Sequence, residues 1–239
     1  TNRIGNFIQQ YGLIPHLGYR VRTLHGLAHD IVREKPARVG LEEQFQIVDD
    51  QEAVRIRADA VRAWLAANPG KMDRYIDDTL ETGRHDWIVR EKLPELLESL
   101  ALAFIRSAKD HRLTPAALAD ALHRQPAPLP LAEMGISIYT DYQRALQYRA
   151  AVDFDDLIRL SLELLLADAE YLERLRHRFP YILEDEAQDS SELQEQILGL
   201  LSGPGGNWVR VGDPNQAIFE TFTTASPELL KRFISNNPH

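Results

Sequence analysis

The sequence predicts an α/β fold, helix-rich overall, in which a parallel-sheet domain is split by an all-helical insertion. A strand-like segment followed by a helix opens the chain, a long stretch of helical periodicity comes next, and two short apolar runs lie near the C-terminus. The chain has 239 residues, 44% of them hydrophobic, which is enough for one or two domains with real cores. We expect the insertion to span residues 37–135, between two parts of the sheet domain at 1–36 and 136–239.

The first elements are a strand and a helix that follow a helical start. Residues 19–23 alternate apolar and polar side chains, which predicts a strand. From Leu24 to Ile31 the apolar residues recur at helical spacing. A strand followed directly by a helix is typical of an α/β domain.

The stretch from about residue 41 to about residue 124 is helical in its periodicity, and no strand pattern interrupts it. Asp49, with Glu52 three positions on, has the pattern of a capping box that starts a helix, and an Asn-Pro-Gly run stops that helix. In a leucine-rich second helix, Pro94 either lies in the first turns or kinks the helix, and Thr114 before a proline starts a third.

The proline-rich segment 125–130 predicts a linker, after which helices recur from about 137 to 178. The apolar runs 181–183 and 208–211 then have the character of buried parallel strands, and each stops close to an acidic residue. In an open α/β sheet the ligand crevice lies at the carboxyl ends of the strands. The candidate functional site is therefore expected there.

Composition and charge exclude several classes of protein. The chain has no cysteine, which removes thiol nucleophiles, cysteine-ligated zinc and iron–sulfur clusters and fits a reducing compartment. Its 27 basic and 36 acidic residues give a net charge of −9, so a uniformly basic nucleic-acid-binding coat is excluded. No apolar run suits a membrane span or a signal peptide, so we expect a soluble, cytoplasmic protein. Because the chain does not begin with Met, we also expect it to be cut from something longer.

The first candidate site follows the first apolar run, where Asp185 and Glu186 stand side by side. A strand end that presents Asp and then Glu supplies one hard oxygen ligand for Mg²⁺ and a neighbour able to take a proton from water. The structural alternative is that the polar residues here cap the following helix, with Ser191 and Gln194 as a capping box. Capping and chemistry are compatible, and both remain open.

The second candidate site follows the second apolar run, which breaks at Gly212 and offers Asp213. The chain then turns through Pro-Asn and presents Gln216, whose amide both donates and accepts hydrogen bonds. Alone this pattern indicates only a turn. Two acidic strand ends in one chain, each with a glutamine nearby, point instead to a ligand site.

These motifs resemble those of the UvrD/Rep-like superfamily 1 DNA helicases. Residues 185–189 (DEAQD) resemble motif II of that family, and residues 211–219 (VGDPNQAIF) resemble motif III. Residues 22–28 (RTLHGLA) are similar to the segment that follows motif Ia, and the stretch from Tyr139 through residues 152–157 (VDFDDL) resembles the return into the first motor domain. The resemblance implies a partial RecA-like motor domain 1A, split by the helical subdomain 1B.

The resemblance also implies roles for individual residues in binding and hydrolysing ATP. Asp185 would hold Mg²⁺, with Glu186 at the same metal site and activating the attacking water. Gln188 and Gln216 would contact the nucleotide and couple its γ-phosphate to the rest of the motor, and Asp213 would lie among the nucleotide-binding residues. ATP and Mg²⁺ are therefore the expected cofactors.

Single-stranded DNA is the partner that the resemblance implies. Thr23 and His25 would contact the strand, while Phe219 and Phe222 would offer faces for base stacking. Stacking of a base on an aromatic ring contributes roughly 1 to 3 kcal/mol and does not depend on sequence. The structural alternative for the two phenylalanines is packing in the core.

Some expected parts of such a motor are missing. The 239 residues contain no G-x-x-x-x-G-K-[ST] phosphate-binding loop, and Gly70-Lys71 in the helical block predicts only a turn. We therefore expect an internal piece of a helicase, without the second motor domain. Glu184 stands where the family usually has an apolar residue, and strand alternation directs it away from Asp185, toward solvent or an unidentified charge. Ala217 replaces the usual serine, and residues 220–225 lack the arginine that usually follows motif III.

Three functional hypotheses remain. The first is part of an ATP-dependent DNA helicase or translocase, inactive as this piece alone. The second is a non-catalytic module, derived from a helicase, that binds single-stranded DNA or a partner protein. The third, a two-metal nuclease, needs several carboxylates or histidines around the metals, and no spacing pairs a histidine with Asp185.

Overall fold

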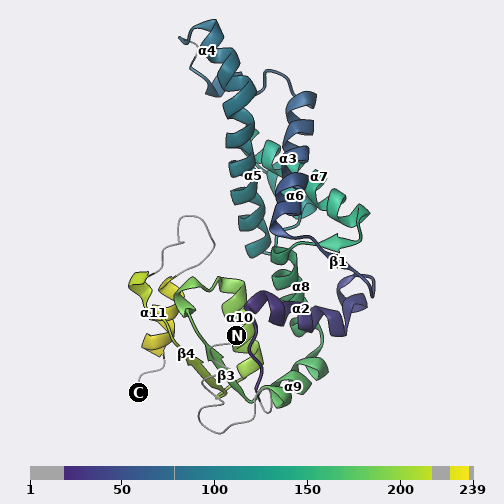
Figure 1. The fold of residues 1–239 in the computed structure, drawn as a ribbon, viewed down its shortest axis with the longest axis vertical. Helices are drawn as coiled ribbons and strands as arrows, with labels where there is room; N and C mark the ends of the chain where they lie inside the picture. Colours follow the sequence, from purple (N-terminus) through teal and green to yellow (C-terminus); the bar gives the residue numbers. More distant parts are fainter. Residues whose placement is uncertain (1–18, 78, 217–226, 237–239) are drawn as a thin grey trace.

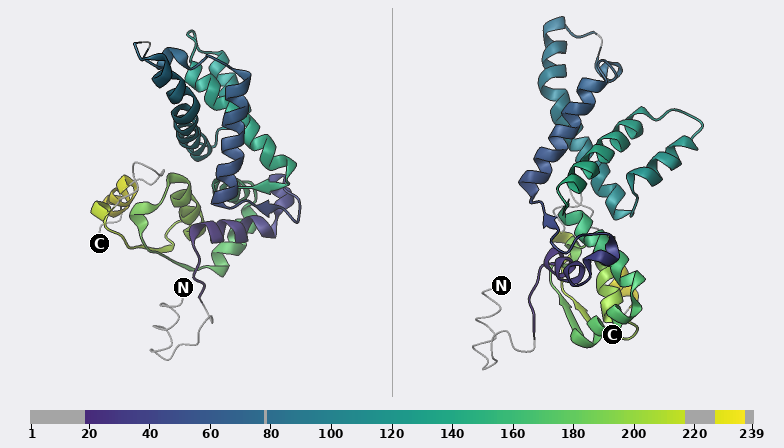
Figure 2. Two further views of the ribbon diagram at one scale, coloured as in Figure 1. Left: turned by 45° about the horizontal axis from the view of Figure 1, so that its top comes forward. Right: turned by 90° about the vertical axis from the view of Figure 1, so that its right-hand side faces the viewer.

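The computed structural model describes residues 19–77, 79–216 and 227–236. The chain forms two parts, which we call the sheet body and the helical tower; the tower stands on the sheet body in Figure 1 and in both views of Figure 2. The elements of the sheet body are α2 (Leu24–Glu34), α8 (Phe154–Ala167), α9 (Ala169–Arg178), β3 (Tyr181–Glu184), α10 (Glu192–Ser202), β4 (Asn207–Arg210) and α11 (Pro227–Asn236). The elements of the tower are α3 (Asp50–Ala67), α4 (Thr82–Trp87), the π-helical turn Ile88–Lys92, α5 (Leu93–Asp110), α6 (Pro115–His123) and α7 (Pro130–Tyr148). A small strand pair, β1 (Gln46–Ile47) and β2 (Ala151–Val152), lies where the two parts meet, and short 3₁₀ turns cover Pro36–Val39, Asp73–Tyr75, Ala187–Asp189 and Pro214–Gln216.

The core of the sheet body forms around α8, whose apolar residues recur at helical spacing. Leu157, Leu162 and Leu164 are fully buried, and they share one apolar cluster with residues of α2, α9 and α10. Asp153 caps α8 by accepting a hydrogen bond from the Asp156 amide at 2.8 Å. Burying a large apolar side chain stabilises a fold by about 1.5 to 3 kcal/mol. This cluster therefore holds the helices together and supports β3.

The tower is held by two apolar clusters between α3, α5 and α7. Trp64 and Leu97 belong to the outer cluster, and Tyr139 and Tyr142 to the one nearer the sheet body. The expected domain boundary at residue 135 falls within α7, most of which packs on α3 and α5. The division into domains stays a prediction.

The two expected late strands form a parallel pair, as the sequence predicted. β3 lies beside β4 in the register Ile182 to Trp208 and Glu184 to Arg210. Only one face of this pair is covered by the described residues, because Leu183 and Val209 on the other face are exposed. The expectation that both strands are buried on both faces is therefore wrong for the part of the chain that is described.

Two other strand predictions are also corrected. Residues 19–23 form no strand, because none of the described residues pairs with their backbone and alternation alone cannot make a sheet. Conversely, β1 interrupts the block expected to be purely helical and pairs in parallel with β2 across the base of the tower. A strand of two residues is too short to leave a periodic signal.

Helix starts follow the capping signals in the sequence. The Asp49 side chain accepts from the Glu52 amide at the start of α3, and Thr114 does the same for Ala117 at the start of α6. Ser191 and Gln194 form the complete capping box of α10. Pro94 lies in the first turn of α5, the first of the two expected alternatives. No helix in the described ranges is both long enough and apolar enough to cross a membrane.

A buried group of charges joins the tower to the sheet body. Lys109, in the last turn of α5, is 1% exposed, and its Nζ lies 2.5 Å from Asp153 Oδ2 and 3.0 Å from Asp156 Oδ2. The Tyr142 hydroxyl donates to the same Asp153 oxygen at 2.7 Å. Burial works to lower the pKa of Lys109, but the two aspartates outweigh it and hold that pKa above its ordinary value.

Candidate functional site

The acidic loop, residues 185–189, follows β3 at its carboxyl end. Asp185 and Glu186 are both exposed, and the Asp185 Oδ1 atom accepts a hydrogen bond from the Glu186 amide at 3.1 Å. Glu186 has φ 55° and ψ 42°, a left-handed conformation that is uncommon for a residue with a side chain. The backbone thus turns sharply at this point, and both carboxylates stay accessible to solvent.

A second loop, residues 211–213, follows β4 and lies directly beside the acidic loop. The Val211 amide donates to the Glu184 carbonyl at 2.8 Å, and the Ala187 amide donates to the Val211 carbonyl at 2.9 Å. The first bond continues the parallel ladder beyond the strands, whereas the second comes from Ala187 and skips Glu186. The two acidic strand ends predicted from the sequence are therefore neighbours at one edge of the sheet.

Gln188 connects the two loops through its side-chain amide. It is buried; its Nε2 donates to Glu186 Oε2 at 2.7 Å, and its Oε1 accepts from the Asp213 amide at 3.1 Å. One amide group therefore touches both acidic strand ends. A movement of either loop therefore strains or breaks a hydrogen bond that Gln188 makes to the other.

Gly212 makes this close approach possible. A Cβ atom at position 212 would lie 2.3 Å from Gln188 Oε1 and 2.9 Å from the Ala187 nitrogen, closer than real side-chain contacts come. Only glycine fits without displacing the Gln188 bridge. The sequence pattern alone predicts only that a strand ends at Gly212.

Glu184 is buried, on the opposite side of β3 from the exposed Leu183. Its direction away from Asp185 agrees with strand alternation, but it meets a charge and not solvent. Arg210, the cross-strand partner in β4, places its Nε atom 2.7 Å from Glu184 Oε2. Sequence reasoning missed Arg210, because only the strand register in the structure shows that it faces Glu184.

The donor set fits a magnesium ion in part. Among the described residues, no three histidine, aspartate or glutamate side chains converge as a metal site. Mg²⁺ commonly takes only one or two protein carboxylates and completes its shell with water and substrate phosphates. The exposed carboxylate of Asp185, next to that of Glu186, suits that kind of partial site.

Asp213 and Gln216, the other two residues predicted at the nucleotide site, lie on the connection that follows β4. Asp213 Oδ1 accepts from the Asn215 amide at 3.0 Å and from Asn215 Nδ2 at 3.1 Å, so this carboxylate shapes the turn after β4. Gln216 ends the following 3₁₀ turn. Its place on the same strand-end connection agrees with the sequence pattern.

Of the four predicted DNA-contacting residues, only two lie in the described part of the chain. The Thr23 hydroxyl accepts from the Gly26 amide at 3.1 Å and caps α2. His25 is half-buried with its ring 5.4 Å from that of Phe154, and burial lowers its pKa, with Asp50 partly opposing the shift. Both residues thus have structural contacts within α2 and α8.

Phe219 and Phe222 lie outside the described residues. Arg22, the cation next to Thr23 in the chain, is paired with Asp30 at 3.0 Å. The proposed DNA face therefore stays a prediction.

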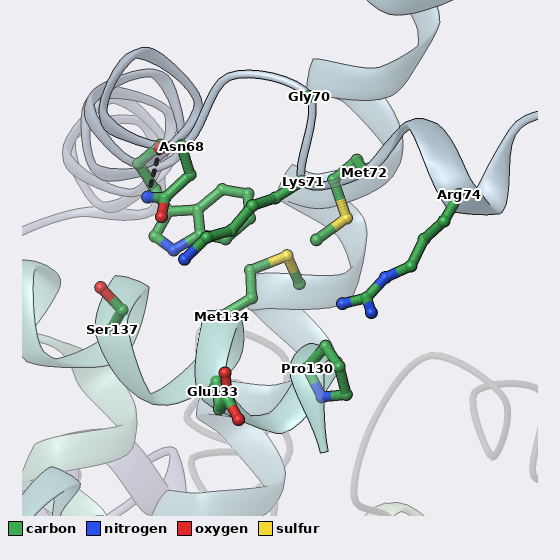
Figure 3. A pocket seen from close by; sticks show the side chains of 10 residues that line it. Asn68, Gly70, Lys71, Met72, Arg74, Pro130, Glu133, Met134 and Ser137 are labelled. Atoms are coloured by element: carbon green, nitrogen blue, oxygen red, sulfur yellow. Dashed lines mark hydrogen bonds between the residues drawn. The ribbon is translucent and has the colours of Figure 1, made fainter. Parts of the chain in front are cut away.

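A hollow of about 570 Å³ lies in the tower, between the end of α3 and the start of α7. Figure 3 shows the Lys71 and Arg74 side chains reaching over it, with the sulfur atoms of Met72 and Met134 between them. Gly70 and Lys71 form the predicted turn. None of the predicted site residues lines this hollow.

Comparison with known proteins gives a consistent picture. Residues 2–238 match the family described as UvrD/REP helicase N-terminal domain. The chain is 29% identical over 221 residues to DNA helicase II of Escherichia coli, which covers 92% of this chain and 26% of that protein. It is 32% identical over 200 residues to the ATP-dependent DNA helicase PcrA of Leuconostoc citreum, covering 83% of this chain and 23% of that protein. The chain therefore spans about a quarter of the length of these relatives.

Proposed function

Because the chain belongs to the UvrD/REP helicase N-terminal domain family, we propose that it is part of an ATP-dependent DNA helicase, with the acidic loop at its site of ATP hydrolysis. The observation that carries this proposal is the Gln188 bridge between Glu186 and the Asp213 backbone. It couples two strand-end loops at the sheet edge where open α/β folds bind ligands. Both relatives are named as DNA helicases, and the one from Leuconostoc citreum is named as ATP-dependent, which supports the same assignment.

Glu186 is the base in this proposal. Its carboxylate takes a proton from water as the water oxygen attacks the γ-phosphorus, and the bond to the bridging oxygen of ADP breaks. Gln188 donates to one carboxylate oxygen and so fixes the direction of the other, which accepts no hydrogen bond from the described residues and is free for water. The solvent exposure of Glu186 lets water reach it.

Asp185 is the proposed metal ligand. A bound Mg²⁺ would neutralise charge on the phosphates, and Asp185 would supply one of its oxygen ligands. The Glu186 amide holds the Asp185 side chain by its Oδ1 atom, and the side chain is exposed to solvent. Motor domain 1A, split by the tower as subdomain 1B, is the architecture that we propose around this site.

The test uses the full-length protein that carries this chain. Glu186→Gln keeps the shape of the side chain but cannot accept a proton, so we expect turnover to fall by about 10²- to 10⁴-fold with nucleotide affinity nearly unchanged. Asp185→Asn should instead weaken binding of the Mg²⁺ nucleotide itself. Phosphate release and nucleotide affinity are measured for both variants.

Glu192→Gln is the matched control, because Glu192 is an exposed carboxylate in the first turn of α10, near the loop. It should leave both quantities unchanged. Turnover of Glu186→Gln within a few-fold of wild type would exclude Glu186 as the base. DNA binding by a wild-type full-length protein that releases no phosphate would favour the alternative, a binding module without turnover.

A further inference from the structure

The carboxylate of Glu184 lies directly beneath the acidic loop and has several partners. Glu184 is 7% exposed, and its Oε1 accepts from the Ser190 hydroxyl at 2.5 Å. Its Oε2 accepts from the Trp208 indole at 3.1 Å and lies 2.7 Å from Arg210 Nε. A buried carboxylate is tolerated only when it is paired and hydrogen-bonded in this way.

Arg210 is itself rigidly held. Its side chain is fully buried, and its Nη1 lies 2.9 Å from Glu195 Oε1 on α10. Its guanidinium lies 4.8 Å from the centre of the Trp208 ring and 5.2 Å from that of Phe233 on α11. Contacts from β3, β4, α10 and α11 therefore fix this group, and through it the Glu184 carboxylate.

The Glu184 to Ser190 bond closes the base of the acidic loop, because the loop leaves β3 at Glu184 and enters α10 just after Ser190. Within the loop, Glu186 is held at positive φ. Such a conformation costs free energy and persists only where the surroundings hold it in place. An apolar residue at position 184 could not make the bond to Ser190.

We propose that Glu184, anchored by Arg210, is a positioning residue that holds the acidic loop in the conformation in which Asp185 and Glu186 act. This inference rests on the proposed function. It assigns a purpose to the one acidic residue that departs from the family pattern at motif II. Neither Glu184 nor Arg210 touches a reacting atom in this arrangement; both act through Ser190 and the loop backbone.

The first experiment measures loop order in this chain and needs no ATP. Amide hydrogen exchange is followed by NMR at Ala187 and Asp189, whose amides bond to the Val211 and Glu186 carbonyls. In Ser190→Ala we expect both amides to exchange about tenfold faster, since local opening becomes easier. Ser202→Ala is the matched control, because it removes a hydroxyl at the other end of α10, and it should leave the loop unchanged.

A double variant, Glu184→Leu with Arg210→Leu, distinguishes loss of the loop contact from unfolding of the chain. Replacing a buried ion pair by apolar residues of similar size is often neutral for stability, so the fold should survive. The indole resonance of Trp208 should shift, because its acceptor is gone, and the loop amides should again exchange about tenfold faster. Wild-type exchange rates in the loop, together with a shifted Trp208 resonance, would overturn the proposal.

The second experiment measures ATP hydrolysis by the full-length protein carrying Ser190→Ala. We expect kcat to fall about tenfold while KM for ATP stays within about twofold, as for a lost orientation effect. An unchanged kcat despite faster loop exchange would overturn the positioning role. If the wild-type protein hydrolyses no ATP, the proposed function fails, whereas the exchange measurements still decide whether Glu184 orders the loop.

Discussion

At the scale of single residues, the site depends on Gly212, which has no side chain. Gly212 lies where the two strand-end loops meet, and the Gln188 amide and the Ala187 backbone already fill the space that a Cβ atom would need. Arg210 and Glu184 form a buried ion pair next to these loops. The site is thus specified by a glycine and a buried ion pair as much as by its exposed carboxylates.

Gly212→Ala is expected to destabilise the chain by about 1 to 3 kcal/mol, the usual cost of forcing extra atoms into a packed position. The new Cβ must displace Gln188 or part the two loops, because it would lie 2.3 Å from Gln188 Oε1. Urea denaturation gives the free energy of unfolding. In the full-length protein the same change should also lower ATP turnover.

Gly199→Ala is the control for that variant. Its Cβ would lie at an ordinary 3.7 Å from Trp208, within α10, so alanine should be neutral or stabilise by about 0.5 to 1 kcal/mol. Equal stability of the two variants would mean that the Gln188 side chain moves aside freely, and would weaken the case for a fixed bridge.

At the scale of elements, the tower and the sheet body are joined by charges where α5 meets α8. Lys109 from α5 reaches both Asp153, the cap of α8, and Asp156 in its first turn. Removing one partner from a buried ionic group leaves the others uncompensated, which costs far more than losing a surface pair. This junction therefore links the last turn of α5 in the tower to the start of α8 in the sheet body.

Lys109→Met is expected to destabilise the chain by about 3 to 5 kcal/mol, because buried Asp153 loses its cation. Among the described residues, buried Asp156 then keeps only one cation, Arg159, at the longer distance of 3.4 Å. Lys92→Met is the matched control: Lys92 pairs with Glu95 on an exposed surface, and its loss should change stability little. Thermal melting of the three proteins makes the comparison. A melting temperature for Lys109→Met equal to that of wild type would show that the junction is held by apolar packing alone.

At the scale of the whole molecule, the chain presents a strand-end site on a sheet that the described residues cover on one face only. Tyr181 and Leu183 on β3 and Val209 on β4 are exposed. The sequence also contains no phosphate-binding loop of the G-x-x-x-x-G-K-[ST] type. The 239 residues thus contain the metal ligand and the base that we propose, but no phosphate-binding loop to hold a triphosphate.

For the 239-residue chain alone we expect no significant ATP hydrolysis, with or without single-stranded DNA. Positioning of the phosphates supplies most of the rate in phosphoryl transfer, and that part is missing from the sequence. Phosphate release is measured beside the full-length protein. DNA-stimulated turnover of about one per second or more from the pure chain would contradict this expectation.

DNA binding serves as the control in that assay. Fluorescence anisotropy of an oligothymidine at low salt reports whether the chain engages the strand at all. With a net charge of −9, binding should be weak and should fade as salt rises.

The sequence alone determined the helices that carry strong local signals. The starts of α3, α6 and α10 follow from Asp49, Thr114 and Ser191, because a cap depends only on residues three positions apart. The acidic pair and the parallel strands β3 and β4 were also predictable, since apolar runs and the residues that end them are local patterns. The family followed from the same motifs.

Only the tertiary structure decided how those motifs interact. Gln188 bridges the two loops, Arg210 neutralises Glu184, and Lys109 joins the tower to α8, each across a long stretch of sequence. Such contacts depend on strand register and helix packing, which no local pattern specifies. The prediction of a strand at residues 19–23 was wrong for the same reason. A strand forms only where another strand supplies its hydrogen bonds, and the tertiary fold decides which neighbours a segment has.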